Sequence, residues 1–417
     1  MLERIKIVWA TARDSLWFIP ALFTLAAAAL AMTLVKLERT YQWELSDAEH
    51  WLLGGGAEGA RQVLSTVAGS LITVTGVVFS VTIVALQLAS SQFTPRILRN
   101  FMADRSNQIV LGVFISTFTY TLLVLRVIRS KDEDGSEFVP QVAVAAAIVL
   151  VLISIGFLIY FIHHAARSMQ ASVILSRVTA EALLQIERLF PDDIGAPDEL
   201  PHDDADMQME RPEAIVASSG GYLQAVDGAS LFDVGRRGRL LIRMTSPVGA
   251  FIVPGQTLAE VWSKEPCNGD MKDQICEAFI LGEERKSGQD VEFCIIEIAD
   301  IAAKALSPGI NDPTTALHCI DRLTQILLAL GERRPPAATR TESGRVHFIA
   351  MHTTFDGALD LAFNQIVHFG ADNPVIMDHV ARSTKQLMQL LASERHAPLR
   401  TLQARIDDCV AGRHQRD

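Results

Sequence analysis

The chain has 417 residues, of which 49% are hydrophobic and only 20% are charged, and its formal net charge is −11. Ordinary soluble chains carry roughly 25% charged residues, so this composition argues against a wholly soluble protein. The acidic balance argues against nucleic-acid binding, which needs a basic face. The apolar excess lies almost entirely before residue 163, and the rest of the chain has the composition of a soluble domain.

Four apolar segments are long enough to cross a bilayer, which takes about 20 residues of helix. They run from about 16 to 35, 63 to 88, 109 to 125 and 142 to 162. Buried helices of a soluble protein are the alternative, but four such runs in so short a stretch favour membrane spans. The predicted fold class is a membrane α-helical domain of four transmembrane helices, followed by a cytosolic α+β domain.

The distribution of charge favours an orientation with both termini in the cytoplasm. Lys and Arg precede the first span and follow the second and the fourth, whereas acids match or outnumber them in the other two connections. Basic residues concentrate on the cytoplasmic side of membrane proteins. We therefore expect a multi-pass protein of the bacterial inner (plasma) membrane, in contact with membrane lipid. All five cysteines lie in the C-terminal half at spacings typical of neither zinc nor redox motifs, which fits reduced thiols.

The second span carries a polar stripe. Thr66, Thr73, Ser80 and Gln87 recur every seven residues and Ser70 widens their row, so the five share one face of a helix. Hydroxyls and small residues pack helices against one another in membranes. Polar side chains also line water-filled paths, and Gln87 favours this second interpretation because an amide needs several hydrogen-bond partners. We predict that the five residues line a pore, with helix packing as the alternative.

The segment after the second span contains Arg96 and Arg99, next to a Thr-Pro pair that is typical of a helix start. One interpretation is a structural elbow between two spans. The other is a basic cytosolic collar at a pore mouth, which would attract anions or anionic lipid. The spans hold no Asp, Glu or Lys well inside the hydrocarbon region, which argues against a proton-coupled carrier.

Beyond the fourth span the pattern predicts four regions. Residues 163–190 continue the last span as a juxtamembrane helix, and residues 191–211 form an acidic linker. Residues 212–265 alternate in short runs with glycine turns, which predicts a small antiparallel β module. Residues 266–417 form a mainly helical cytosolic domain with one further strand.

The string ALSPGINDPTTALHCIDRL joins two helices of that last region. Asp290 is expected to cap the first helix, and Asp312 the second, with Pro313 in its first turn. A tight helix–helix corner explains the string, but a helix start can also bind an anion. The residues of this possible ligand site or structural corner are Ser307, Asn311, Asp312, Thr314 and Thr315.

No spacing of nucleophile and base, phosphate loop or metal ligands emerges, so we predict no catalytic residue, no metal and no cofactor. The strings STVAGSLITVTGVVFSVTIVALQLASSQFTPRILRNF, FIHHAARSMQ and ALSPGINDPTTALHCIDRL resemble those of a bacterial domain-of-unknown-function family of predicted four-span inner-membrane proteins. The resemblance covers nearly the whole chain. It implies four spans and a cytosolic C-terminal region, and no assigned activity.

Two function hypotheses follow from these patterns. In the first, the protein is a homo-oligomeric ion channel or pore-like conduit lined by the second transmembrane helix. In the second, it is a membrane-anchored regulatory or scaffold protein whose cytosolic domain binds a partner or a small anion.

Overall fold

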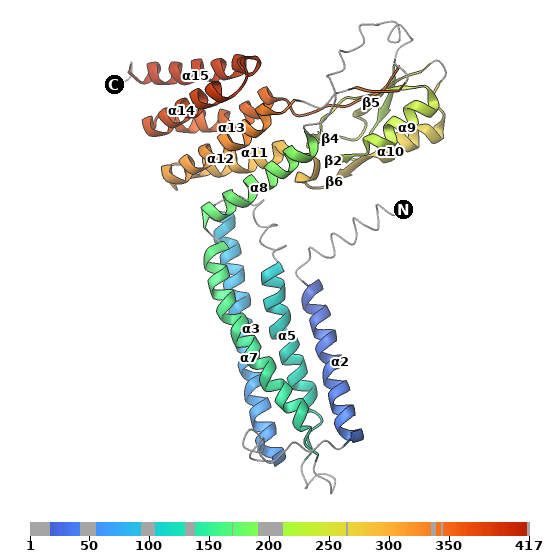
Figure 1. The fold of residues 1–417 in the computed structure, drawn as a ribbon, viewed down its shortest axis with the longest axis vertical. Coiled ribbons are helices and arrows are strands. Elements are labelled where there is room, and N and C mark those ends of the chain that lie inside the picture. The colour runs from blue at the N-terminus through green and yellow to red at the C-terminus, as the bar shows by residue number, and fades with distance from the viewer. Residues whose placement is uncertain are drawn as a thin grey trace. The chain divides into compact units, whose positions relative to one another are not determined.

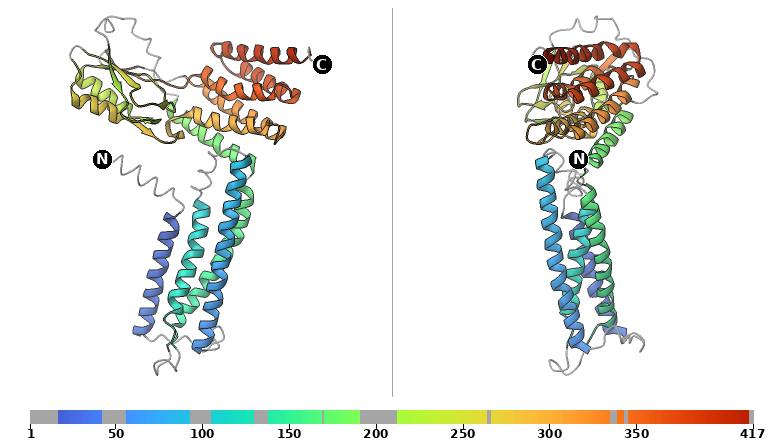
Figure 2. Two further views of the ribbon diagram at one scale, coloured as in Figure 1. Left: turned by 180° about the vertical axis from the view of Figure 1, so that it is seen from behind. Right: turned by 90° about the vertical axis from the view of Figure 1, so that its left-hand side faces the viewer.

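The structure is a computed structural model that describes residues 17–41, 56–92, 105–129, 138–168, 170–190, 212–263, 266–334, 339–342 and 345–414. The chain divides into two compact units, residues 1–170 and 171–417. Figures 1 and 2 show the elements of both units. The acidic linker predicted at residues 191–211 lies outside the described residues.

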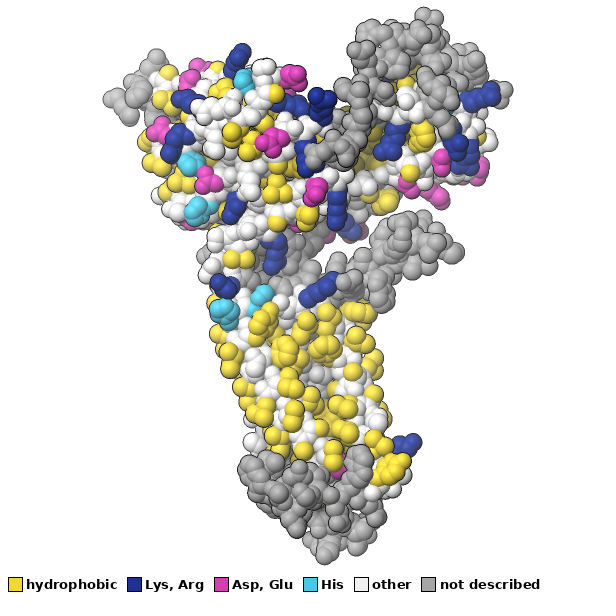
Figure 3. Space-filling view, viewed as in Figure 1, with side chains coloured by type: hydrophobic (Ala, Val, Ile, Leu, Met, Phe, Trp, Pro, Cys, Tyr) yellow, Lys and Arg dark blue, Asp and Glu magenta, His cyan; other side chains and the backbone are white. Residues whose placement is uncertain are grey.

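The N-terminal unit contains four helices, all long and apolar enough to cross a membrane. Figure 3 shows hydrophobic side chains gathered over the visible face of these helices, as contact with lipid requires. The four predicted spans are thus confirmed, although α2 continues past the predicted end at residue 35 and α3 begins before residue 63. The helices are α2 (Phe18–Tyr41), α3 (Gly56–Gln92), α5 (Arg105–Leu125) and α7 (Gln141–Ser168).

Helix α5 is the central helix of this unit, because each of the other three contacts it more extensively than any other helix. In its most apolar window 56% of the residues are buried, against 17% to 22% in the other spans. Two apolar clusters hold the helices together. One gathers around Leu64, Tyr120 and Val144, and the other around Leu71, Phe114 and Phe161. Helix α3 contacts α5 and α7 and therefore presents one long face outward.

The C-terminal unit contains a five-stranded sheet of order β1-β5-β3-β8-β7 and a three-stranded sheet of order β4-β2-β6. Neighbouring strands are antiparallel except β3 and β8, which run parallel with Ile242 opposite Phe348. The sheets therefore extend beyond the contiguous antiparallel module expected at 212–265. The strands are β1 (Glu213–Val216), β2 (Gly221–Val226), β3 (Leu241–Met244), β4 (Phe251–Ile252), β5 (Thr257–Trp262), β6 (Phe279–Gly282), β7 (Thr339–Glu342) and β8 (Arg345–Ile349).

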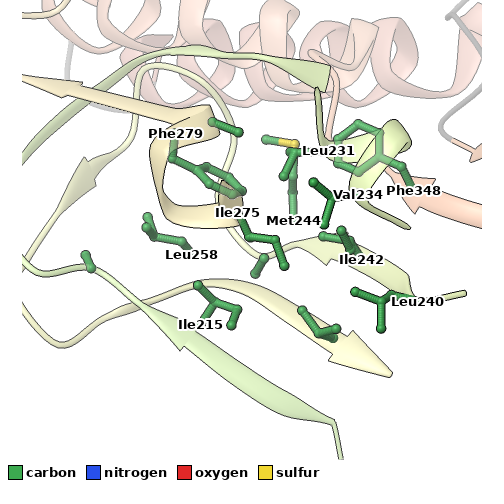
Figure 4. Close-up of a cluster of buried hydrophobic side chains, with 14 of the residues drawn as sticks. Ile215, Leu231, Val234, Leu240, Ile242, Met244, Leu258, Ile275, Phe279 and Phe348 are labelled. Carbon is green, nitrogen blue, oxygen red and sulfur yellow. The ribbon is translucent and has the colours of Figure 1, made fainter. Parts of the chain in front are cut away.

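Two helices, α9 (Gly228–Gly238) and α10 (Gly269–Ala278), pack with these strands around one apolar core. Figure 4 shows Leu231 and Val234 of α9 and Ile275 of α10 among the buried strand residues. Helix α9 was not expected from the sequence. It begins where the carboxylate of Asp227 accepts a hydrogen bond of 3.0 Å from the Ser230 amide.

The remaining helices pack on one another (Figures 1 and 2). Helix α8 lies against α11 and α12, α13 packs mainly on α11, and α14 packs mainly on α12. The predicted caps are confirmed: Asp290 accepts from the Phe293 amide and Asp312 from the Thr315 amide. The single helix expected from the fourth span to Leu189 is instead two helices that are interrupted before Ala171. These helices are α8 (Ala171–Leu189), α11 (Val291–Ala305), α12 (Pro313–Glu332), α13 (Phe355–Gly370), α14 (Pro374–Leu390) and α15 (His396–His414), with short 3₁₀ turns at Ser287–Gln289 and Ser393–Arg395.

Candidate functional site

The stripe residues of α3 lie on the face that is exposed in the single chain. On the opposite face Leu64, Leu71 and Val78 are buried against neighbouring helices. The structure thus brings all the residues of the predicted stripe onto the outside of the single-chain bundle. The exposed residues of the stripe are Thr66, Ser70, Thr73, Ser80 and Gln87.

Three hydroxyls of the stripe are hydrogen-bonded within their own helix. Thr66, Ser70 and Thr73 donate to the carbonyl oxygens four residues earlier, at 2.8, 2.8 and 2.9 Å. Such bonds satisfy the hydroxyl proton inside a membrane without a partner helix. The oxygen lone pairs still face outward as acceptors for water, a cation or a neighbouring helix.

Two glycines leave the helix backbone uncovered by side chains beside these hydroxyls. A Cβ atom placed on Gly69 or Gly76 would meet nothing within 4 Å. In membranes, small residues of this kind allow another helix to approach the backbone closely. The outward face of α3 therefore combines hydrogen-bond acceptors with space for a close neighbour.

The stripe is about as long as the hydrocarbon core of a bilayer is thick. From Thr66 to Gln87 it covers roughly 32 Å of helix, at about 1.5 Å per residue, and the hydrocarbon region is about 30 Å thick. The whole helix has 37 residues, or about 55 Å, so it reaches beyond the hydrocarbon core.

Sequence reasoning missed a buried carboxylate in the span unit. The side chain of Glu38, near the end of α2, accepts hydrogen bonds from the amides of Val142 (2.7 Å) and Ala143 (3.1 Å). It therefore caps the first turn of α7, whose amides have no partner within that helix. Glu38 is 6% exposed. The sequence pattern ended the first span at about residue 35 and therefore placed Glu38 in a connecting loop. In the structure α2 continues to Tyr41, so Glu38 lies within the helix.

Polar contacts also join α5 to α7 inside the bundle. The buried hydroxyls of Thr117 and Ser154 lie 3.1 Å apart, and the Tyr120 hydroxyl donates to the Ala143 carbonyl at 2.9 Å. These groups form part of the packed interior, whereas the α3 stripe lies on the outside. The hypothesis of a basic collar at Arg96 and Arg99 falls outside the described residues.

The corner between α11 and α12 is hydrogen-bonded within itself. The Ser307 carbonyl accepts from the amides of Ile310 and Asn311, and the Asp312 carboxylate accepts from the amide and the hydroxyl of Thr315. These bonds, the Thr315 hydroxyl first, lower the pKa of Asp312. Asn311 has a left-handed backbone at φ 48°, which an Asn tolerates. Its side chain and that of Thr314 are exposed.

Elsewhere in the C-terminal unit the described residues hold no group of three or more His, Cys, Asp or Glu side chains placed to bind a metal. The cysteine thiols are unpaired, and burial raises the pKa of Cys294 and Cys319 well above its ordinary value. Thiols in such surroundings are poor nucleophiles at neutral pH.

Four apolar helices followed by a domain of sheets and helices define a multi-pass membrane protein with a large C-terminal domain. Residues 13–386 match the family model described as "Predicted membrane protein (DUF2254)", and the chain belongs to that family. The resemblance noted in the sequence is therefore confirmed.

Relatives of the chain occur in mycobacteria. An uncharacterized protein of Mycobacterium bovis is 32% identical over 410 residues, which cover 94% of this chain and 74% of that protein. An uncharacterized protein of Mycobacterium tuberculosis matches with the same identity and coverage. No solved structure matches the chain significantly.

Proposed function

We propose that the protein is a homo-oligomeric, pore-like conduit for ions in the inner membrane, with α3 of each copy lining the path. The observation that carries this proposal is the outward stripe from Thr66 to Gln87. It is polar, exposed in the single chain and as long as the hydrocarbon core is thick. A symmetric ring of copies would turn such faces towards a common axis, where hydroxyl and amide groups replace the hydration of an ion.

The flanks of the stripe support the same arrangement. Ile72 and Phe79 of α3, which lie beside the stripe, are each more than half exposed in the single chain. In a ring these apolar side chains would pack against neighbouring copies or lipid, while the stripe would line the water-filled path. The open backbone at Gly69 and Gly76 would let adjacent α3 helices approach closely.

The test is ion flux into liposomes that contain the purified protein. Ser80→Trp should abolish flux while the oligomer still assembles, because the indole would fill the narrow path. The matched control is Leu152→Trp, which places the same bulk on an exposed position of α7 and should conduct like the wild type. Equal flux from both variants, or none from correctly folded wild type under several salts and potentials, would contradict the conduit.

The second candidate function is a membrane-anchored regulatory or scaffold protein. The exposed side chains of Asn311 and Thr314 at the α11–α12 corner favour it, since they are available to a partner or a small anion. Under this hypothesis Asn311→Ala would abolish the biological function, and Ser80→Trp would leave it intact. The conduit hypothesis expects the opposite result from the same pair of variants.

A further inference from the structure

A pocket of about 210 Å³ opens in the C-terminal unit where the parallel strands β3 and β8 end. Its walls come from Pro247 and Val248, which follow β3, from residues 350–353, which follow β8, and from the end of α8. Because β3 and β8 run parallel, the segments that follow them leave the sheet at the same edge and line one hollow together.

The floor of the pocket is apolar and fixed in place. Phe190, Met244 and Phe348 line it and are 4%, 4% and 1% exposed. Figure 4 shows Met244 and Phe348 within the core cluster of the β strands. The Phe190 carbonyl accepts a hydrogen bond of 2.6 Å from Arg333, so the end of α8 is tied to α12. A preformed apolar floor suits the carbon skeleton of a small ligand.

The rim of the pocket carries positive charge. Arg340 lies opposite Phe348 in the β7–β8 pair, so the two side chains share a face of the sheet. Arg340 is exposed and makes no ion pair with any residue that the structure describes. His352 is the other titratable side chain of the lining, to which the described residues contribute no carboxylate.

The neighbouring helix start adds little to this charge. Gly228, the first residue of α9, also lines the pocket. The N-terminus of α9 is already closed by its own cap, because Asp227 accepts from the amide and the hydroxyl of Ser230. Recognition of a charged group at the pocket therefore rests on Arg340 at the rim.

We propose that this pocket binds a small organic carboxylate whose apolar body contacts Phe190, Met244 and Phe348 and whose charged group pairs with Arg340. A volume of about 210 Å³ is smaller than the roughly 300–1,000 Å³ of pockets for drug-sized molecules, so the ligand is small. The pocket shares no residue with the α3 stripe or with the Asn311 corner, and the proposal does not depend on whether the protein conducts ions.

The probes are 2-naphthoate and its neutral analogue 2-naphthamide, titrated by calorimetry at pH 7 into full-length protein in lipid nanodiscs. Empty nanodiscs supply the background. The acid should bind saturably, with one site per chain and about tenfold more tightly than the amide. That ratio is the effect of one partly exposed, charge-assisted hydrogen bond.

Two variants locate the site. Arg340→Gln should weaken binding of 2-naphthoate about tenfold and make acid and amide equal, whereas Arg400→Gln, at an exposed position of α15, should change neither. Val248→Trp should fill the pocket and abolish binding of both probes. Equal affinity for acid and amide in the wild type, unchanged binding by Arg340→Gln, or no saturable binding to folded protein would each overturn the proposal.

Discussion

At the scale of single residues, Glu38 contacts a part of the chain that is remote in sequence. It lies 104 residues before the Val142 amide that it accepts from, so no local pattern could pair the two. A carboxylate at a helix N-terminus satisfies orphan amides and interacts favourably with the helix dipole. Because Glu38 is buried, its loss would leave two amides of α7 without a hydrogen-bond partner.

We therefore expect Glu38→Ala to destabilise the span unit by about 1–3 kcal/mol, the usual cost of unsatisfied buried donors. Thermal unfolding of the full-length protein in detergent would measure the loss. Glu58→Ala, which removes an exposed acid from the first turn of α3, should cost less than about 1 kcal/mol. Equal effects of the two variants would show that the cap contributes nothing.

Asp312 provides a test that depends on pH. Its folded-state pKa is lowered, mainly by the Thr315 hydroxyl, so its stabilisation is complete above the ordinary Asp pKa of about 3.9. That stabilisation is lost as pH falls through the lower, folded-state pKa. Asp312→Ala should cost about 1 kcal/mol at pH 7, the typical value of an N-cap, and clearly less at pH 3. Unfolding midpoints of both proteins at the two pH values would check this, and a difference independent of pH would contradict it.

At the scale of elements, the turn between β3 and β4 packs against the start of α11. Gly249 in this turn has φ +91°, and a Cβ there would overlap the Arg285–Asp290 pair. In that pair Arg285 Nη2 lies 3.0 Å from Asp290 Oδ1, and the Asp290 side chain is 1% exposed. The turn thus closes over a buried ion pair that also caps α11.

We predict that Gly249→Ala is far more destabilising than Gly255→Ala. Gly255 also has a positive φ of +83°, but a Cβ there meets nothing within 4 Å. Left-handed strain alone should cost Gly255→Ala about 1–2 kcal/mol. Gly249→Ala should add the cost of disturbing a buried pair, for a total of about 3 kcal/mol or more. Melting temperatures in one detergent would compare the two, and similar losses would refute the role of the pair.

The elements that the sequence could predict are those with local signals. Span helices follow from apolar length, and the caps at Asp290 and Asp312 follow from residues within three positions of them. The sheet could not be predicted in the same way, because β3 pairs with β8 about a hundred residues later in the chain. The pocket at the ends of those strands depends on that pairing, so it could not be predicted from the sequence either. Helix α9 was missed because its glycines at both ends are typical of turns.

At the scale of the whole molecule, a repeat of seven residues was enough to place Thr66, Thr73 and Ser80 on one face of α3. It could not indicate whether that face points into the bundle or out of it. This depends on how α5 and α7 cover α3, which is a matter of packing between distant segments. Because the stripe faces outward, its role depends on what lies next to α3 outside the single chain, such as a neighbouring copy.

The two units also differ in the number of large apolar side chains that are exposed on their surfaces. Each has its own buried residues, and in the C-terminal unit one apolar cluster gathers residues from 215 to 348. Exposed large apolar side chains crowd the spans, whereas in the described part of the C-terminal unit they are fewer and spread from Val173 to Leu390. Scattered exposed apolar residues are normal for water-soluble domains.

We therefore predict that residues 171–417, expressed without the spans, form a folded and soluble domain. The fragment should unfold in one cooperative transition by circular dichroism and sediment as a discrete species without detergent. Its stability should respond to Gly249→Ala as that of the full chain does, because the turn and the buried pair lie wholly within it. A fragment that aggregates, or that melts without cooperativity, would mean that the spans contribute to the core of this unit.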